Sequence, residues 1–233
     1  MWSSGSASQR ILSLWLDRLP TDRIRQQRRE ASASGRNRAS APPLVVFGKR
    51  GNLDLLVALD AAAERLGLRC GLALAQARAM HPALAAVPED QAADARLLDA
   101  IADWCQRYTP LVAADPPEGI LFDIGGCAHL FGGEEKLRDD LLARMTRLGL
   151  SAHAAVAATI GAASAAARFG DVAATADASR DARECLAPLP LAALRLSDET
   201  VAALARLGLK RIGDILDLPR APLAARFGAD LLR

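Results

Sequence analysis

Short apolar runs of strand length alternate with longer helical segments along this chain, and this alternation constrains its fold more than any other feature. Glycine, proline and polar residues bound the runs, which is typical of buried strands. The runs predicted as strands are residues 11–16, 43–47, 118–124 and 151–158. The segments predicted as helices are 53–66, 72–80, 92–108, 136–148 and 162–169. This order predicts an α/β or α+β domain with a mixed sheet.

The composition limits what can fill the core and where the chain works. Of the 233 residues, 51% are hydrophobic but only 4% are aromatic, so Ala, Leu and Val must fill a core of one to two domains. The four cysteines are scattered without a CxxC pair and there are only three histidines, which gives no zinc signature. We expect reduced thiols in a cytoplasmic protein. No apolar run reaches the ~18 residues of a membrane span.

Two segments lack helical or strand periodicity. Residues 1–10 are small and polar, and they predict a disordered tail without the apolar core of a signal peptide. Residues 25–43 (RQQRREASASGRNRASAPP) are basic and contain Ser, Gly and Pro, so they predict a flexible loop.

The pattern changes after Pro188-Leu-Pro190. Residues 197–207 predict a helix that begins at a Ser N-cap, and residues 207–216 (LGLKRIGDIL) have the form of a helix–hairpin–helix. Its turn is expected to expose backbone N–H groups beside cations, which is a suitable phosphate site. The predicted DNA contacts are Arg206, Gly208, Lys210 and Arg211. The alternative is a plain helical hairpin with solvated charges.

Other patterns predict no catalytic or metal site. The pairs Gly125-Gly126 and Gly132-Gly133 do not fit the phosphate-loop spacing, and they indicate ordinary turns. The histidines His81, His129 and His153 have no Cys, Asp or Glu at ligand spacing. No Ser/His/Asp arrangement can be identified by position.

Three stretches together resemble the Y-family translesion DNA polymerases. Residues 11–24 (ILSLWLDRLPTDRI) lie where that family has its first catalytic strand. Residues 64–78 (ERLGLRCGLALAQAR) match its fingers segment, R-x-x-G-(V/I)-x-x-G-M-x-x-x-x-A. Residues 116–124 (PPEGILFDI) lie where the family has S-I-D-E-A-Y-L-D. Within the family, the segments LWLDRLPTDR, ADWCQRYTP and DPPEGILFDIGGCAHLFGG and the thumb segment look most like the ImuB group.

The resemblance implies an α+β fold with a palm of mixed sheet and helices, fingers and a helix–hairpin–helix thumb, the little finger being absent. Its expected boundaries are a tail at 1–10, palm at 11–24, basic loop and fingers at 25–90, palm at 91–187 and a truncated thumb at 188–233.

The departures from the family concern the catalytic site. In ungapped alignment, Trp15 takes the first metal-ligand position, and Glu118 and Gly119 take the acidic pair. An indole cannot coordinate Mg²⁺, which prefers oxygen ligands. Asp17 and Asp123 remain but flank the family's main ligands.

Three further positions depart from the family's nucleotide site. Pro20 lies where an aromatic residue checks the sugar, and Ala61 and Glu64 lie where a Tyr and an Arg hold the triphosphate. We therefore expect no catalytic residue, no metal, no cofactor and no enzymatic activity.

The resemblance to the ImuB group predicts a non-catalytic scaffold or DNA-binding subunit in a damage-induced (SOS) mutagenic translesion complex. Expected partners are DNA, a RecA-like accessory protein, an error-prone replicative-type polymerase and the sliding clamp, with no membrane. One alternative is an active polymerase fragment whose metal site is shifted to Asp17 or Asp115. A second is an unrelated helix–hairpin–helix module, for which the first and third catalytic-position strands would not be neighbours.

Overall fold

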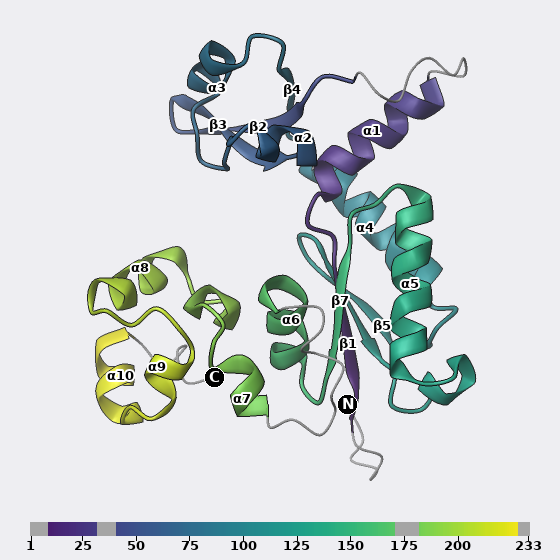
Figure 1. The fold of residues 1–233 in the computed structure, drawn as a ribbon, viewed down its shortest axis with the longest axis vertical. Helices are drawn as coiled ribbons and strands as arrows, with labels where there is room; N and C mark the ends of the chain where they lie inside the picture. Colours follow the sequence, from purple (N-terminus) through teal and green to yellow (C-terminus); the bar gives the residue numbers. More distant parts are fainter. Residues whose placement is uncertain (1–8, 32–40, 171–181, 228–233) are drawn as a thin grey trace.

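A computed structural model describes residues 9–31, 41–170 and 182–227, which form three parts. A central sheet with its helices lies between a small sheet and a helical part, residues 182–227 (Figure 1). The predicted tail 1–10 lies mostly outside the described residues, as do residues 32–40 of the predicted basic loop and residues 228–233 of the predicted thumb. No described helix is long and apolar enough to cross a membrane.

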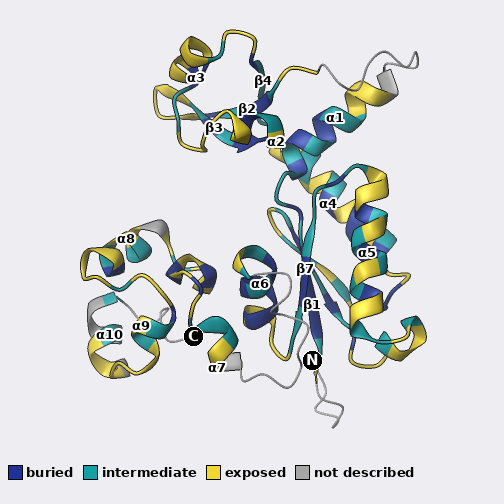
Figure 2. Cartoon of the chain, in the orientation of Figure 1, coloured by how far each residue is buried: buried dark blue, intermediate teal, exposed yellow. Residues whose placement is uncertain are grey.

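The central sheet has the order β5-β6-β1-β7 and is antiparallel throughout. Its strands are β1 (Ile11–Trp15), β5 (Val112–Asp115), β6 (Gly119–Asp123) and β7 (His153–Ala157). Helices α4 (Gln91–Cys105) and α5 (Glu134–Leu148) cover one face, and α6 (Ile160–Phe169) covers the other (Figure 1). Buried Leu12, Leu14 and Phe122 form the core of the sheet (Figure 2).

The small sheet is the mixed one, with the order β3-β2-β4. Strand β2 (Leu44–Arg50) is antiparallel to β3 (Leu53–Leu59) and parallel to β4 (Ala85–Pro88). Two short helices, α2 (Ala61–Arg65) and α3 (Leu74–Met80), complete this part. The mixed sheet predicted from the sequence is therefore here, and not in the central sheet.

The prediction of one helix over 53–66 is wrong, because its first half is strand β3. The register pairs Arg50 with Leu53, so Gly51 and Asn52 form a two-residue hairpin turn. Gly51 has φ +60°, the conformation that such turns require and glycine adopts without strain. The helix begins only after Asp60, whose carboxylate accepts a hydrogen bond from Ala63 N at 2.8 Å.

The predicted flexible loop at 25–43 is also wrong in its first part, where helix α1 (Leu19–Ala31) continues. Ile24 packs with Leu44 and Val46 of the small sheet. Gln26 Nε2 donates to Leu148 O at 2.7 Å, which caps the end of α5. Tertiary contacts thus stabilise a polar helix that the residue composition did not indicate.

The helical part packs against α6 through aliphatic side chains. It contains α7 (Ala182–Leu186), η2 (Leu191–Leu194), α8 (Asp198–Arg206), α9 (Gly213–Leu216) and α10 (Arg220–Phe227); a further short helix, η1 (Ala128–Phe131), precedes α5. Ala165 of α6 is buried with Leu189, Ala193 and Ile212. The predicted N-cap is confirmed, since Ser197 Oγ accepts from Thr200 N at 3.3 Å.

Candidate functional site

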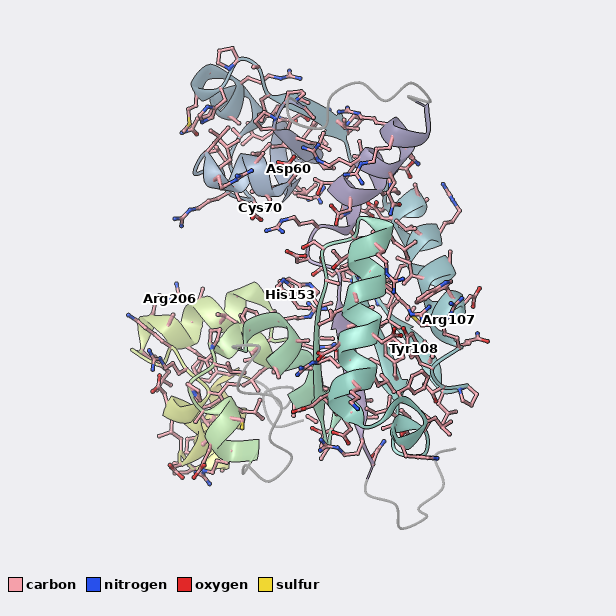
Figure 3. The ribbon with its side chains drawn as sticks, turned by 45° about the vertical axis from the view of Figure 1, so that its right-hand side comes forward. Asp60, Cys70, Arg107, Tyr108, His153 and Arg206 are labelled. Carbon is pink, nitrogen blue, oxygen red and sulfur yellow. The ribbon has the colours of Figure 1, made fainter. Side chains whose placement is uncertain are left out.

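Trp15 ends β1 and lies between the two neighbouring strands. Its ladder partners are Gly119 of β6 and His153 of β7. The indole Nε1 donates to Glu118 Oε1 at 2.9 Å, and the indole and His153 rings are 5.5 Å apart at an angle of 34°. The guanidinium carbon of Arg168 lies 6.0 Å from the centre of the indole ring. Figure 3 shows His153 at the edge of the central sheet that faces the small sheet.

The carboxylates near Trp15 all have guanidinium partners. Glu118 Oε1 lies 3.6 Å from Arg168 Nη1. Arg18 bridges two acids, with Nη1 at 3.4 Å from Asp17 Oδ2 and Nη2 at 2.6 Å from Glu64 Oε2. Arg18 lies between β1 and α1, and Glu64 lies in α2. The ion pair therefore connects the central sheet to the part that contains the small sheet.

The pKa of the nearby Cys70 thiol is affected by the negative charges of this region. Burial raises its pKa, and the charges of Glu64 and Glu118 raise it further. A raised pKa disfavours the thiolate, which is the nucleophilic form.

The residues around Trp15 do not fit the two-metal centre that the fold implies. The indole N–H is only a donor, so it cannot hold a cation, and it donates to Oε1 of the neighbouring Glu118. Asp17 Oδ1 is buried without a hydrogen-bond partner. Among the described residues, however, no three His, Cys, Asp or Glu side chains are grouped as metal ligands.

A hollow of about 420 Å³ lies next to this position. Pro20 and Glu118 line it together with Val46 and Val57 of the small sheet and the Pro116-Pro117 turn. Its walls are thus largely apolar, with carboxylates at the rim. Arginines pair with several of these acids: Arg23 Nε donates to Asp94 Oδ1 at 2.6 Å, and Arg50 Nη1 donates to Glu89 Oε1 at 2.7 Å.

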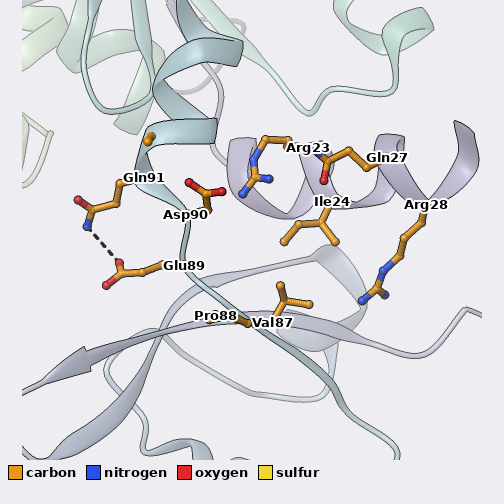
Figure 4. Close-up of a pocket in the computed structure, with 10 residues that line it drawn as sticks. Arg23, Ile24, Gln27, Arg28, Val87, Pro88, Glu89, Asp90 and Gln91 are labelled. Atoms are coloured by element: carbon orange, nitrogen blue, oxygen red, sulfur yellow. Dashed lines mark hydrogen bonds between the residues drawn. The ribbon is translucent and has the colours of Figure 1, made fainter. Parts of the chain in front are cut away.

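A larger and more open groove of about 900 Å³ separates α1 from the connection between β4 and α4 (Figure 4). Arg23, Ile24 and Arg28 of α1 line one side of it. Glu89 lies on the other side, where it accepts from Gln91 Nε2 at 3.1 Å. Acidic and basic side chains face each other here, so the groove has no marked preference for either charge.

The residues predicted to contact DNA lie together on an exposed turn. Arg206, Gly208, Lys210 and Arg211 are all exposed, and Arg206 points away from the central sheet in Figure 3. The expectation of free backbone N–H groups is wrong for Gly208, Lys210 and Arg211. Gly208 N donates to Ala205 O at 3.0 Å. Lys210 N and Arg211 N both donate to Asp214 Oδ2 at 2.8 Å, which lowers the pKa of Asp214. The side chains, and not these amides, are available to a phosphate.

Several residues of the site were missed by sequence reasoning. Arg18 and Arg168 are far apart in the sequence, and His153 was set aside for lack of ligand spacing, yet its Nε2 lies 3.8 Å from Asp17 Oδ2. Only the strand register, which places position 153 beside position 15, could have indicated this contact.

The fold defines the class of protein. Dbh DNA polymerase, in its insertion ternary complex, matches 96% of this chain with a TM-score of 0.67 and 15% identity, over 65% of its own chain. DinB from Sulfolobus solfataricus matches with a TM-score of 0.65 and 15% identity, over 64% of its own chain. At this identity the likeness shows the fold alone, which resembles the palm and fingers of Y-family polymerases.

The particular family follows from the sequence profile of the impB/mucB/samB family, which matches residues 31–168. The chain belongs to this family, so the alternative of an unrelated module is wrong; β1 and β6 are indeed neighbours.

Protein ImuB of Caulobacter vibrioides (strain NA1000 / CB15N) is 48% identical over 163 residues, which are 70% of this chain and 35% of that protein. ImuB of strain ATCC 19089 / CIP 103742 / CB 15 gives the same values. The chain spans about a third of the length of these curated relatives.

Proposed function

We propose that this chain is the palm, fingers and thumb portion of a non-catalytic polymerase-like subunit that binds DNA in a translesion complex. In this assignment residues 11–24 and 91–187 are palm, 25–90 are fingers and 188–233 are thumb. The chain's similarity to ImuB supports a role in DNA damage tolerance. The α8–turn–α9 arrangement supports a thumb that contacts DNA.

The hydrogen bond from Trp15 Nε1 to Glu118 carries the proposal. Polymerase chemistry needs carboxylates that hold two Mg²⁺ ions against the 3′-hydroxyl and the triphosphate. Here the Trp15 indole, a hydrogen-bond donor, takes the position of one ligand. It donates to Glu118, which takes the position of another. With this hydrogen bond formed, the Glu118 carboxylate is less available to bind a cation.

The fingers side of the site supports the same conclusion. Glu64 lies where the resemblance expects an Arg, and a carboxylate there repels a triphosphate. Its ion pair with Arg18 also uses the cation nearest to it. Ala61 has no hydroxyl to donate.

The test is primer extension on a primed template with Mg²⁺ and, separately, Mn²⁺. We expect no template-directed nucleotide addition above the no-enzyme control. Extension that disappears in Asp17→Ala or Glu118→Ala variants would overturn the proposal, because it would identify a working metal site.

One observation favours a second candidate, an active polymerase with a shifted metal site. Asp17 Oδ1 is a buried acceptor without a partner, as a metal ligand would be in a metal-free site. Titration of a fluorescent nucleotide with and without Mg²⁺ separates the candidates. Mg²⁺-dependent binding that is lost in Asp17→Asn would favour the active enzyme.

The remaining partners are proposed from the similarity to ImuB. They are a RecA-like accessory protein, an error-prone replicative-type polymerase and the sliding clamp, acting in the cytoplasm during the SOS response. A pull-down of each purified partner by this chain, compared with a pull-down by a longer chain that contains it, tests which contacts this portion makes.

A further inference from the structure

The helical part is fastened to the central sheet by one arginine. Arg195 follows η2, and its Nη1 donates to Asp115 Oδ1 at 3.0 Å while its Nη2 donates to Asp115 Oδ2. The same Nη2 donates to Ser164 Oγ of α6 at 2.9 Å. Ser164 is buried, and its hydroxyl lies 3.5 Å from Ser13 Oγ of β1. One guanidinium thus joins the helical part to β5 and, through α6, to β1.

The backbone of Arg195, at the C-terminal end of η2, has a conformation that side chains seldom adopt. Its φ is +57°, and it is the one non-glycine residue with positive φ in the described part of the chain. A side chain in this region costs free energy that glycine would avoid, so it persists where surrounding contacts over-determine it. A bidentate bond to a carboxylate is a contact of fixed geometry that a lysine cannot reproduce.

The apolar contact between the two parts is one cluster of aliphatic side chains. Ala165, Leu189, Ala193 and Ile212 form it, with Leu186 partly buried beside them. Such packing holds the parts together but sets their relative direction only weakly, since the hydrophobic effect is non-directional. The directional restraint comes from Arg195.

Asp115, the carboxylate that accepts from Arg195, lies directly against Gly119. A Cβ at Gly119 would lie 2.8 Å from Asp115 O and 3.0 Å from Asp115 Oδ2. The first atom is backbone and cannot move aside cheaply. Any side chain at 119 therefore disturbs the carboxylate that receives Arg195.

We propose that Arg195 is a positioning residue that locks the helical part, and with it the basic turn, against the palm, and that this lock requires Gly119. The lock and an acidic residue at 119 exclude each other. The second half of the inference rests on the proposed function, because it explains why the family's acid is absent here; the first half does not.

The test compares Arg195→Gly, Arg195→Lys, Asp115→Asn and Gly119→Ala with the parent chain. Hydrogen exchange of α6, which the helical part covers, is measured against α5 on the opposite face. We expect α6 amides to exchange at least about tenfold faster in Arg195→Gly, Asp115→Asn and Gly119→Ala, with α5 unchanged and Arg195→Lys intermediate. Arg144→Ala, which removes the Arg144–Asp140 pair on α5, is the matched control and leaves α6 unchanged.

The double variant Asp115→Asn/Arg195→Gly should exchange no faster than either single variant, because both remove the same interaction. Arg195→Gly relieves the positive φ, so a folded variant with loosened α6 separates positioning from stability. Parent-like α6 exchange in Arg195→Gly or Gly119→Ala, or additive effects in the double variant, would overturn the inference. Primer extension and DNA affinity are separate readouts, so failure of the proposed function leaves this result interpretable.

Discussion

At the residue scale, Trp15 and Gly119 differ from polymerase ligands in ways that a simple reversion does not repair. We predict that Trp15→Asp/Gly119→Glu stays inactive in primer extension. The triphosphate still meets Glu64 and lacks a donor at Ala61, and loss of one such donor typically lowers the rate about 10²–10³-fold.

The same variant should also be less stable. It loses the bond from Trp15 to Glu118 and places a side chain 2.8 Å from Asp115 O. We expect a loss of order 2–4 kcal/mol in unfolding free energy, measured by urea denaturation. Recovered Mg²⁺-dependent extension, or an unchanged transition midpoint, would show that the site is only damaged and not rebuilt as structure.

Tyr108 gives a pH-dependent prediction at the same scale. Its buried hydroxyl donates to Asp140 Oδ2 at 2.7 Å. Burial, followed by this bond, raises the pKa of Tyr108, and the bond, followed by Arg144, lowers the pKa of Asp140. The bond's contribution is therefore complete between the two ordinary values, 3.8 for Asp and 10.0 for Tyr.

We expect Tyr108→Phe to lower the unfolding free energy by about 1 kcal/mol at pH 5–9. The difference from the parent shrinks as pH falls through the depressed pKa of Asp140, because the protonated acid no longer attracts the hydroxyl as a carboxylate does. Denaturation curves at several pH values check this. A constant difference down to pH 2 would mean that the effect is packing alone.

At the scale of elements, the Gly51-Asn52 turn sets the register of the β2–β3 hairpin. Gly51→Ala forces an L residue to φ +60° and should destabilise the chain by about 1 kcal/mol. Gly126→Ala is the matched control, since Gly126 has negative φ and no neighbour within 4 Å of a Cβ, so it should be neutral or slightly stabilising. Equal unfolding free energies for the two variants would contradict the role of the turn.

This turn also explains how far the sequence could predict the fold. The apolar run 53–59 fits a buried strand and a helix alike. The dipeptide Gly51-Asn52 before it is a hairpin-turn signal and favours the strand. Strands β1, β2, β6 and β7 and helices α3 to α6 were predicted, because their apolar patterns are unambiguous. Strands β4 and β5 have four residues each, too few to show a period.

The site was predictable only in part, for a different reason. The departures at Trp15, Gly119 and Glu64 could be found by comparing the sequence with the family's motifs. Their new partners do not, since Arg18, Arg168 and His153 meet them through strand register and the packing of the parts. Asp214, which closes the amides of the hairpin turn, lies only four residues from Lys210 but requires the turn's geometry to be recognised.

At the scale of the whole molecule, ion pairs join parts that are distant in sequence. Arg18, just before α1, pairs with Glu64, and Arg23 of α1 pairs with Asp94. Arg195–Asp115 connects the helical part to the central sheet. Cations paired in this way are less available to phosphates. We expect the DNA contact at the exposed basic turn, although the net charge of the chain is only +2.

We predict weak, sequence-independent DNA binding through this turn, with a dissociation constant in the non-specific range of ~10⁻⁴–10⁻⁶ M. Affinity should fall steeply with salt, because each neutralised phosphate releases counterions. Lys210→Ala/Arg211→Ala should weaken binding and reduce the slope of log K against log salt by roughly 1–2, measured by fluorescence anisotropy. Arg144→Ala on α5 controls for the loss of a cation elsewhere on the surface, since it removes a cation that already pairs with Asp140. An unchanged slope in the double variant, or an equal loss in the control, would place the DNA contact elsewhere; Asp214 has already closed the two amides, so the side chains are the remaining donors at this turn.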